Sequence, residues 1–270
     1  MKILVNEQSV EIEEGVTADE LRNRIKQNAD IIIVDGAPAR HSLRLRPGCS
    51  VTLIKRGEIP SSDELEALMA ARHTPGVHEK VRDATVGIAG VGGLGSHVAV
   101  ALARTGVGKL ILADFDIVEP SNLNRQCFFT DQIGVSKVEA MRANLERINP
   151  YITIETHRLK LDSKNCVEIF EGVDALVEAF DGAEGKAMLT TAFCCAFPAT
   201  PLVGASGVAG YFPGNIVQVR RFAGNVWIVG DLEHAAAPGM GLMAPRVGIA
   251  AHQQANAVLR LLLGEDPVEG

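Results

Sequence analysis

Hydrophobic and polar positions alternate with two different periods along this chain, which predicts short strands and longer helices. Apolar runs of strand length occur at residues 84–89, 109–113, 152–157, 173–179, 201–205, 215–220 and 226–229. Helical patterns separate most of these runs, at residues 96–105, 137–149, 185–197 and 247–263. This order predicts an α/β fold, namely a Rossmann-like, mostly parallel sheet with helices on both faces. The last strands are expected to form an antiparallel end.

The first 57 residues follow a different pattern and are predicted to form a small domain of their own. Thr17 and Glu20 have the spacing of a capping box, which opens a helix through Asn28. Strands are predicted at residues 2–6, 10–12, 31–34 and 51–55, with a hairpin between the first two. Strands around one helix in this order are typical of a ubiquitin-like, β-grasp fold.

Between the two regions lies a linker with a helix. Ser61 and Glu64 have the spacing of a second capping box, and the helix they open is predicted at residues 63–72. We therefore expect three parts: a ubiquitin-fold domain at 1–57, a linker with helices at 58–83, and a nucleotide-binding domain at 84–270.

A glycine-rich turn follows the first strand of the large domain. Gly90, Gly92, Gly93 and Gly95 stand between that strand and the helix at 96–105, and Asp114 ends the next strand, 19 residues after Gly95. In a βαβ unit, the first glycine allows a tight turn, the second lets backbone amides approach a phosphate, and the last lets the helix pack on its strand. The helix N-terminus adds partial positive charge. This arrangement predicts a nucleotide site in which Asp114 binds the ribose.

The residues after Asp114 indicate which nucleotide the site takes. Arg125 and Lys137 could neutralise the charges of a triphosphate, whereas an NAD site needs little more than the acid. Asp181 follows the strand at 173–179, at the edge where a carboxylate could hold Mg²⁺. The sequence therefore favours ATP with Mg²⁺. Asp116 is open to either a capping role or a supporting role beside the ligand.

The region from Val86 to about Gly264 resembles the adenylating domain of the ubiquitin-activating-enzyme superfamily, and within it the ThiF-type sulfur-carrier adenylyltransferases. The resemblance is carried by Gly90–Gly95, Asp114–Asp116, Ser121–Gln126 (Ser-Asn-Leu-Asn-Arg-Gln), Lys137 and Asp181. It implies that ATP·Mg²⁺ is bound by these residues, Asn122 included. It also implies that the C-terminal carboxylate of a small carrier protein attacks the α-phosphate and releases pyrophosphate. Finally, it implies a homodimer in which Arg72 reaches the neighbour's site.

The N-terminal region resembles a ThiS-type sulfur carrier, on the basis of Met1–Gln8 and Gly48–Ile54. A working carrier ends in a free Gly-Gly carboxylate. Here the chain continues through Lys55-Arg-Gly-Glu-Ile-Pro60, without a Gly-Gly pair. We therefore expect that the fused domain is not the substrate, and that the partner is a separate carrier ending in Gly-Gly. A docking role and a regulatory role for the fused domain remain open.

Composition and charge exclude further classes of protein and of site. The net charge is −7, and residues 59–270 carry 17 Lys/Arg against 24 Asp/Glu, which disfavours a large nucleic-acid surface. No apolar run approaches the ~18 residues of a membrane span. The five cysteines show no C-x-x-C spacing, so we expect no zinc site and reduced thiols in the cytoplasm. No cysteine lies in residues 224–245, which leaves a covalent carrier intermediate in doubt.

The leading hypothesis is thus ATP-dependent adenylylation of a ThiS-type carrier in the synthesis of the thiamine thiazole. Two enzymatic alternatives remain, beside a non-catalytic binding module, which the joint presence of Arg125, Lys137 and Asp181 disfavours. A superfamily relative could adenylate another carboxylate, as the tRNA-modifying cyclases do. An NAD-dependent oxidoreductase would satisfy the glycine pattern alone, although it would leave Arg125, Lys137 and Asp181 without a task.

Overall fold

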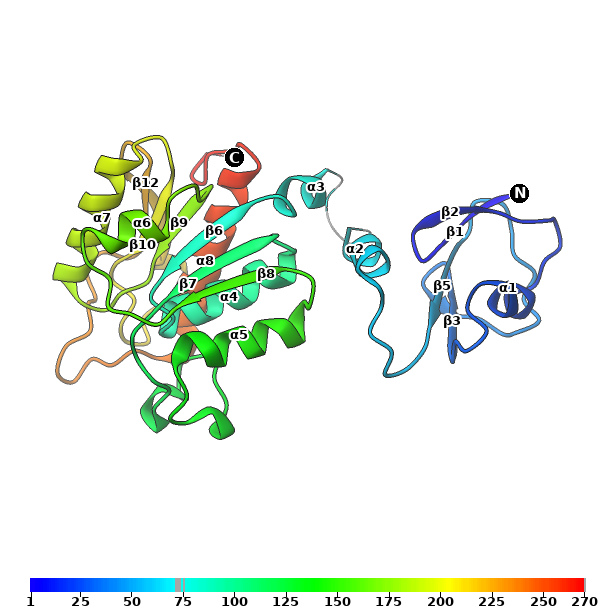
Figure 1. Ribbon diagram of the computed structural model, residues 1–270, viewed down its shortest axis with the longest axis horizontal. Helices are drawn as coiled ribbons and strands as arrows, with labels where there is room; N and C mark the ends of the chain where they lie inside the picture. Colours follow the sequence, from blue (N-terminus) through cyan, green and yellow to red (C-terminus); the bar gives the residue numbers. More distant parts are fainter. Residues whose placement is uncertain (71–73, 75, 270) are drawn as a thin grey trace. The chain divides into compact units, whose positions relative to one another are not determined.

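The structure is a computed structural model that describes residues 1–70, 74 and 76–269. The chain forms two compact units, Met1–Pro75 and Gly76–Gly270. Each is described by itself below (Figure 1). Arg72 lies outside the described residues. Among the described residues, no helix is both long and apolar enough to cross a membrane.

The first unit is a five-stranded sheet packed on one helix. Its strands lie in the order β2-β1-β5-β3-β4, and β1 runs parallel to β5. The bounds are β1 Lys2–Val5, β2 Gln8–Glu11, β3 Ile31–Val34, β4 Ala37–Pro38, β5 Ser50–Ile54, α1 Ala18–Ile25 and α2 Ser62–Ala70. Leu21 of α1 packs with Ile3, Val51 and Leu53 of the sheet in one hydrophobic core. The predicted ubiquitin-like fold is therefore confirmed.

Both predicted helix starts are present, but only one capping box is complete. Thr17 Oγ1 accepts a hydrogen bond from the backbone of Glu20, whose side chain accepts one from the backbone of Thr17. At the start of α2, the backbone of Glu64 donates to Ser61 Oγ across 3.3 Å, but the Glu64 carboxylate contacts Lys26 and Asn6 instead. A tertiary ion pair thus competes successfully with the local cap.

The second unit is a seven-stranded sheet between two layers of helices. The strand order is β11-β12-β10-β9-β6-β7-β8, parallel except for the β11–β12 pair. The strands are β6 Thr85–Ala89, β7 Lys109–Ala113, β8 Thr153–His157, β9 Ala175–Glu178, β10 Leu202–Ala205, β11 Gln218–Ala223 and β12 Val226–Gly230. The predicted Rossmann-like sheet with an antiparallel end is confirmed.

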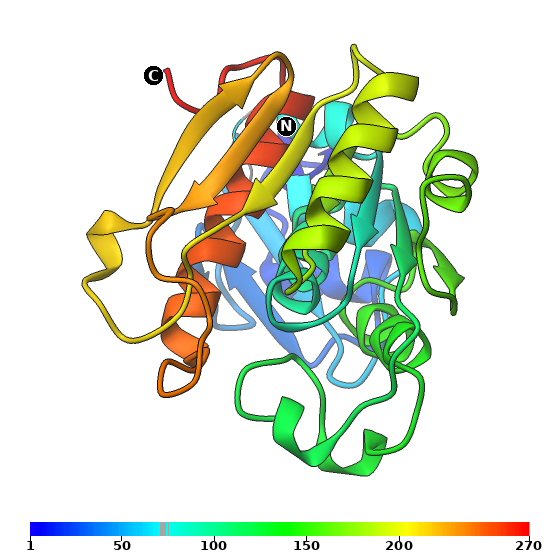
Figure 2. The same ribbon diagram turned by 90° about the vertical axis from the view of Figure 1, so that its left-hand side faces the viewer.

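Two hydrophobic clusters, one on each face of the sheet, explain the layering. The helices are α3 Val77–Val81, α4 Gly93–Thr105, α5 Lys137–Ile148, α6 Asn165–Ile169, α7 Ala183–Ala196 and α8 Ala244–Leu262. Helices α4, α5 and α8 share one cluster with alternate strand residues such as Ile88 and Val177. Helices α6 and α7 share the other with Ala89 and Leu176. In Figure 2, α8 passes behind the orange strands and α7 lies in front.

Two parts of the second unit differ from the sequence prediction. The strand expected at 215–220 is β11 at Gln218–Ala223, because residues Gly214–Ile216 form a 3₁₀ turn. Helix α6 was not predicted. It spans only five residues, and the Asp162 carboxylate accepts hydrogen bonds from the backbone of Lys164 and Asn165 at its start. Such a short helix has too few turns to show a period.

Candidate active site

The glycine loop, Gly90–Gly95, runs from the end of β6 into the first turn of α4 and packs too tightly to accept side chains at two positions. Gly90 has φ +91°, and a Cβ there would lie 2.9 Å from the carbonyl oxygen of Ala179. A Cβ at Gly95 would lie 1.9 Å from the carbonyl oxygen of Gly90. A Cβ at Gly92, in contrast, would meet nothing closer than Gln126 Nε2 at 3.8 Å. The space above Gly92 is therefore open to a ligand.

Asp114 ends β7 beside this loop. One of its carboxylate oxygens accepts a hydrogen bond from the backbone of Val91 across 2.7 Å, and the other accepts one from the backbone of Asp116 across 2.9 Å. The carboxylate thus fixes the glycine loop and the turn after β7 together. Each oxygen keeps a second lone pair for a ligand hydroxyl.

Lys137, the first residue of α5, is buried next to Asp116. Its Nζ lies 2.8 Å from Asp116 Oδ2, and only 8% of its side chain is exposed, against 46% for Asp116. The backbone of Lys137 also donates to the carbonyl of Asp116. The sequence left the role of Asp116 open, and the geometry makes it the partner that holds Lys137.

Arg125 and Asn122 lie on the segment between β7 and α5. Asn122 is buried, and its Oδ1 accepts a hydrogen bond from the backbone of Glu119 across 3.0 Å. Arg125 Nη1 donates to the carbonyl of Ser121 and to Asn124 Oδ1, while its buried Nε has no partner among the described residues. Arg125 Cγ lies 3.9 Å from a Cβ built on Gly93, so this cation borders the glycine loop.

His97 supports the position of Arg125 from α4. Its Nε2 donates a hydrogen bond to the carbonyl oxygen of Arg125 across 3.3 Å. Burial lowers the pKa of the His97 ring, and the neighbouring ring of His252 lowers it further. The sequence alone predicts no role for His97, because a histidine without a partner at ligand spacing is most often a packed or solvated residue.

Asp181 lies at the same edge of the sheet, three residues after β9. Since Ala89 of β6 pairs with Glu178 of β9, the two strands end side by side. Asp181 is exposed and makes no hydrogen bond or ion pair with the described residues. The described residues contain no group of three metal-ligating side chains. One free carboxylate nevertheless fits Mg²⁺, which commonly takes one or two carboxylates and completes its shell with water and phosphate.

A buried ion pair between β9 and α7 was not predicted. Lys186 Nζ contacts both oxygens of Glu178, at 2.9 and 3.0 Å, and donates to the carbonyl of Ala205 at 3.0 Å. Glu178 is 2% exposed. The sequence feature that could have indicated this pair is the glutamate inside the apolar run at 173–179, since a buried carboxylate needs a cationic partner.

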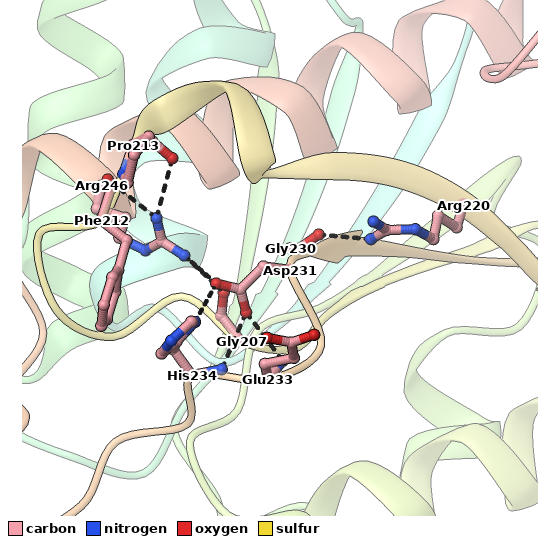
Figure 3. Close-up of polar contacts among 9 residues, drawn as sticks. All are labelled: Gly207, Phe212, Pro213, Arg220, Gly230, Asp231, Glu233, His234 and Arg246. Atoms are coloured by element: carbon pink, nitrogen blue, oxygen red, sulfur yellow. Dashed lines mark hydrogen bonds and ion pairs between the residues drawn. The ribbon is translucent and has the colours of Figure 1, made fainter.

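A second polar cluster, also unpredicted, lies at the end of β12 (Figure 3). Asp231 Oδ2 accepts hydrogen bonds from His234 Nδ1, across 2.6 Å, and from the Arg246 guanidinium of α8. Asp231 Oδ1 accepts from the backbone of Glu233 and His234. Burial alone would raise the pKa of Asp231. The backbone donors, the His234 ring and the Arg246 charge outweigh it and lower the pKa to about 2.

Arg246 ties this cluster to the loop after β10. Its Nη1 donates to the carbonyls of Phe212 and Pro213, and its side chain is 3% exposed. A Cβ on Gly207 would lie 2.1 Å from Asp231 Oδ1, so only glycine leaves room for the carboxylate.

The cysteines of this unit are poorly placed as nucleophiles. Cys127 follows the Arg-Gln motif and is half-buried, and burial raises the pKa of its thiol. Burial also raises the pKa of Cys166 and Cys194. Cys195 is exposed, but it lies at the last turn of α7, far along that helix from Asp181.

Comparison with known families decides the classification. The model of the ThiF family matches residues 66–269, and that of the ThiS-like ubiquitin family matches residues 1–57. The chain belongs to the ThiF family. This agrees with the resemblance seen in the sequence, and a ThiS-like ubiquitin domain precedes the ThiF region.

Curated relatives include ubiquitin-like modifier-activating enzyme 5. The Bombyx mori protein is 34% identical over 192 residues, which are 65% of this chain and 47% of that protein. The Caenorhabditis briggsae protein is 43% identical over 117 residues, 43% of this chain and 27% of that protein. This ThiF-family chain thus spans at most about half the length of these relatives.

Solved structures share the fold. The E. coli tRNA N6-threonylcarbamoyladenosine dehydratase TcdA, in complex with ATP, has a TM-score of 0.68 at 23% identity and covers 77% of this chain and 98% of its own. E. coli MccB with MccA-N7isoASN has a TM-score of 0.56 at 25% identity, covering 71% of this chain and 60% of its own. At this level of identity, the TcdA likeness supports the fold alone.

Proposed function

We propose that this protein is an ATP-dependent adenylyltransferase that acts on the C-terminal carboxylate of a small, separate ThiS-type sulfur carrier ending in Gly-Gly. The products are the carrier adenylate and pyrophosphate. The observation that carries the proposal is the arrangement at one edge of the sheet. A glycine loop that is open above Gly92 lies beside Arg125 on one side and the free carboxylate of Asp181 on the other.

Each residue at this edge has a task in that reaction. Asp114 keeps lone pairs for the ribose hydroxyls of ATP, and the open space at Gly92 admits the phosphates to the N-terminus of α4. Arg125 and Lys137 supply positive charge before pyrophosphate leaves, with Asn122 fixing the segment that carries Arg125. Asp181 would hold Mg²⁺, which neutralises phosphate charge when bound.

The same edge argues against the two alternatives. In an NAD-dependent oxidoreductase, neither the buried Lys137, held by Asp116, nor the unpartnered Asp181 would have a function. A tRNA-modifying cyclase needs a basic surface for its substrate, whereas residues 59–270 carry an excess of acidic residues. The likeness to TcdA does not alter this, because it concerns the fold.

We further propose that the protein works in the cytoplasm as a homodimer, in the synthesis of the thiamine thiazole. Arg72 of one chain would complete the neighbour's site. This rests on the family resemblance of the sequence, since Arg72 lies outside the described residues. Mixing Arg72→Ala and Asp181→Ala subunits should restore roughly a quarter to a half of the activity, because mixed dimers hold one intact site.

ATP–pyrophosphate exchange tests the proposed function. Exchange should appear only with a carrier ending in Gly-Gly, and Asp181→Ala or Arg125→Ala should abolish it with the fold intact. Asp131→Ala is the matched control, because Asp131 is another exposed carboxylate of the same domain. Near-normal exchange by both site variants would show that the site is misplaced.

A further inference from the structure

His234 and Asp231 form a dyad with the geometry of an oriented base. The Asp231 carboxylate is anionic at neutral pH and can only accept, so His234 Nδ1 must carry the proton that joins them across 2.6 Å. In the neutral ring, Nε2 therefore bears the lone pair. Nε2 has no partner among the described residues (Figure 3), and 25% of the His234 side chain is exposed.

The surrounding structure fixes the ring. The Phe212 ring packs on the His234 ring, with centroids 3.7 Å apart, and Arg246 holds the Phe212 carbonyl in place. Leu232, between the two dyad residues, has φ +68°, a left-handed conformation that is strained for a leucine. Such strain persists only where the surroundings impose it, and it concentrates at functional sites.

The dyad lies at the same sheet edge as the proposed adenylylation site. Ala205 of β10 pairs with Val229 of β12, and Val203 pairs with Val177 of β9, so the three strands end together. At about 4.8 Å per strand, the end of β12 lies about 10 Å from that of β9. Strand β10 lies between β9, which precedes Asp181, and β12, which precedes the dyad. An acyl group above the end of β10, at Ser206, is thus about 5 Å from each of these two strands.

Adenylation itself gives this base nothing to do. A carboxylate attacks as an anion and no proton has to be removed, so a base at this edge indicates a second step that consumes the adenylate. A thiol suits an imidazole base, because their ordinary pKa values of about 8.5 and 6.5 are close, whereas water is far weaker as an acid. Burial raises the pKa of the half-buried Cys127 and Cys194 thiols, and the exposed Cys195 lies at the far end of α7. None of these is a ready nucleophile, so the thiol would come from outside.

We propose that His234, oriented by Asp231, is the general base that activates the thiol of a separate sulfur donor for attack on the carrier adenylate. The S–H proton passes to Nε2, and the sulfur electron pair forms the C–S bond at the acyl carbon. The acyl C–O bond breaks, and its electron pair leaves with AMP. The products are a carrier thioester and AMP. This inference rests on the proposed function.

The test separates the two steps in the full-length protein. Carrier adenylate is formed with ATP·Mg²⁺ and a Gly-Gly carrier, and dithiothreitol is added as the probe thiol. Pyrophosphate exchange reports the first step, and intact mass of the carrier thioester reports the second. His234→Gln should slow thioester formation by about 100-fold and keep exchange within about threefold of normal.

Two further measurements distinguish a base from a structural residue. At neutral pH the unaltered protein should form the thioester faster than His234→Gln, and the two rates should converge at alkaline pH, where dithiothreitol ionises without a base. Asp231 stays charged over this range, and the other charged groups drawn around the dyad are Arg246, Arg220 and the exposed Glu233. Free imidazole should restore part of the rate to His234→Ala. His41→Gln is the control, since His41 forms a comparable pair with Asp19 across 2.8 Å in the other unit.

Each result decides between distinct conclusions. Normal thioester formation by His234→Gln overturns the inference and leaves the proposed function intact. Equal loss of exchange and thioester formation also overturns it, because His234 would then only shape the site. If the unaltered protein forms no carrier adenylate with any Gly-Gly carrier, the proposed function fails and the inference with it.

Discussion

The carboxylate of Asp114 accepts a hydrogen bond from the backbone amide of Val91 across 2.7 Å. The acid at the end of β7 and the glycine loop after β6 are therefore one structural unit before any nucleotide arrives. Preorganised polar groups of this kind need little rearrangement on binding, which lowers the cost of ordering the site.

Two glycines of the loop should respond differently to the same substitution. Gly95→Ala forces a Cβ to within 1.9 Å of the Gly90 carbonyl, so we expect a loss of about 3 kcal/mol of stability along with nucleotide binding. Gly92→Ala meets no close atom, so stability should change by less than about 1 kcal/mol, while ATP affinity falls because the methyl group occupies the ligand's space. Urea unfolding measures the stability of each variant, and calorimetric titration with ATP measures its ATP affinity. Equal ATP affinity in Gly92→Ala and the unaltered protein would place the phosphates elsewhere.

Lys137→Met should weaken ATP binding by about 10- to 100-fold with little change in stability. One charge-assisted hydrogen bond contributes about 1.5–3 kcal/mol. Methionine fills the buried space of the lysine, and the released Asp116 stays hydrated because it is 46% exposed. The matched control is Lys109→Met, which breaks a similar pair with Glu155, 2.7 Å long, at the start of β7. If both variants bind ATP equally well, Lys137 is a structural residue.

Asp231 should make the free energy of unfolding depend on pH in the acidic range. Its pKa falls from 3.8 in the unfolded chain to about 2 in the folded protein, so its contribution is present above pH 4 and is lost as pH falls toward 2. The shift corresponds to about 2 kcal/mol. Urea unfolding measures the difference in free energy of unfolding between the unaltered protein and Asp231→Asn. This difference should be about 2 kcal/mol larger at pH 6 than at pH 2. A difference that does not vary with pH would refute this account.

Lys26 should control the segment that follows the N-terminal domain. Its Nζ lies 2.8 Å from Glu58 and 3.2 Å from Glu64, and Asn6 also donates to Glu64. The hydrogen bond to Glu58 raises the pKa of Lys26, so the lysine stays charged at neutral pH. In Lys26→Met, amide hydrogen exchange at residues 58–64 should become about fivefold faster, a loss of about 1 kcal/mol. Lys2→Met, which removes an exposed pair with Glu11, should leave those amides unchanged.

The fold and half of the site follow from local sequence features. Strand length, helical period and the positions of Gly90, Gly95 and Asp114 each follow from a short stretch of chain, so the glycine loop and its acid are predictable. The pairing of Lys137 with Asp116 spans 21 residues and was not predicted, although both residues were named as candidates.

The cluster around Asp231 was missed for a physical reason. Its carboxylate follows β12, His234 lies on a loop, and Arg246 belongs to α8, so no fixed spacing connects them. Only the strand order brings the ends of β10 and β12 together. An acid two residues after the strand predicted at 226–229 was the one available sign of this cluster, and that acid is Asp231. Glu178 and Lys186 are a similar case, joined by tertiary packing between β9 and α7.

Intact mass of the reaction mixture tests the central claim most directly. The full-length protein is incubated with ATP·Mg²⁺, alone and with a separate carrier ending in Gly-Gly. We predict that the carrier gains the mass of one AMP and that the full-length chain gains none, because the fused domain continues past Gly57 and offers no free carboxylate. AMP attached to residues 1–58, or no AMP on any Gly-Gly carrier, would contradict the account.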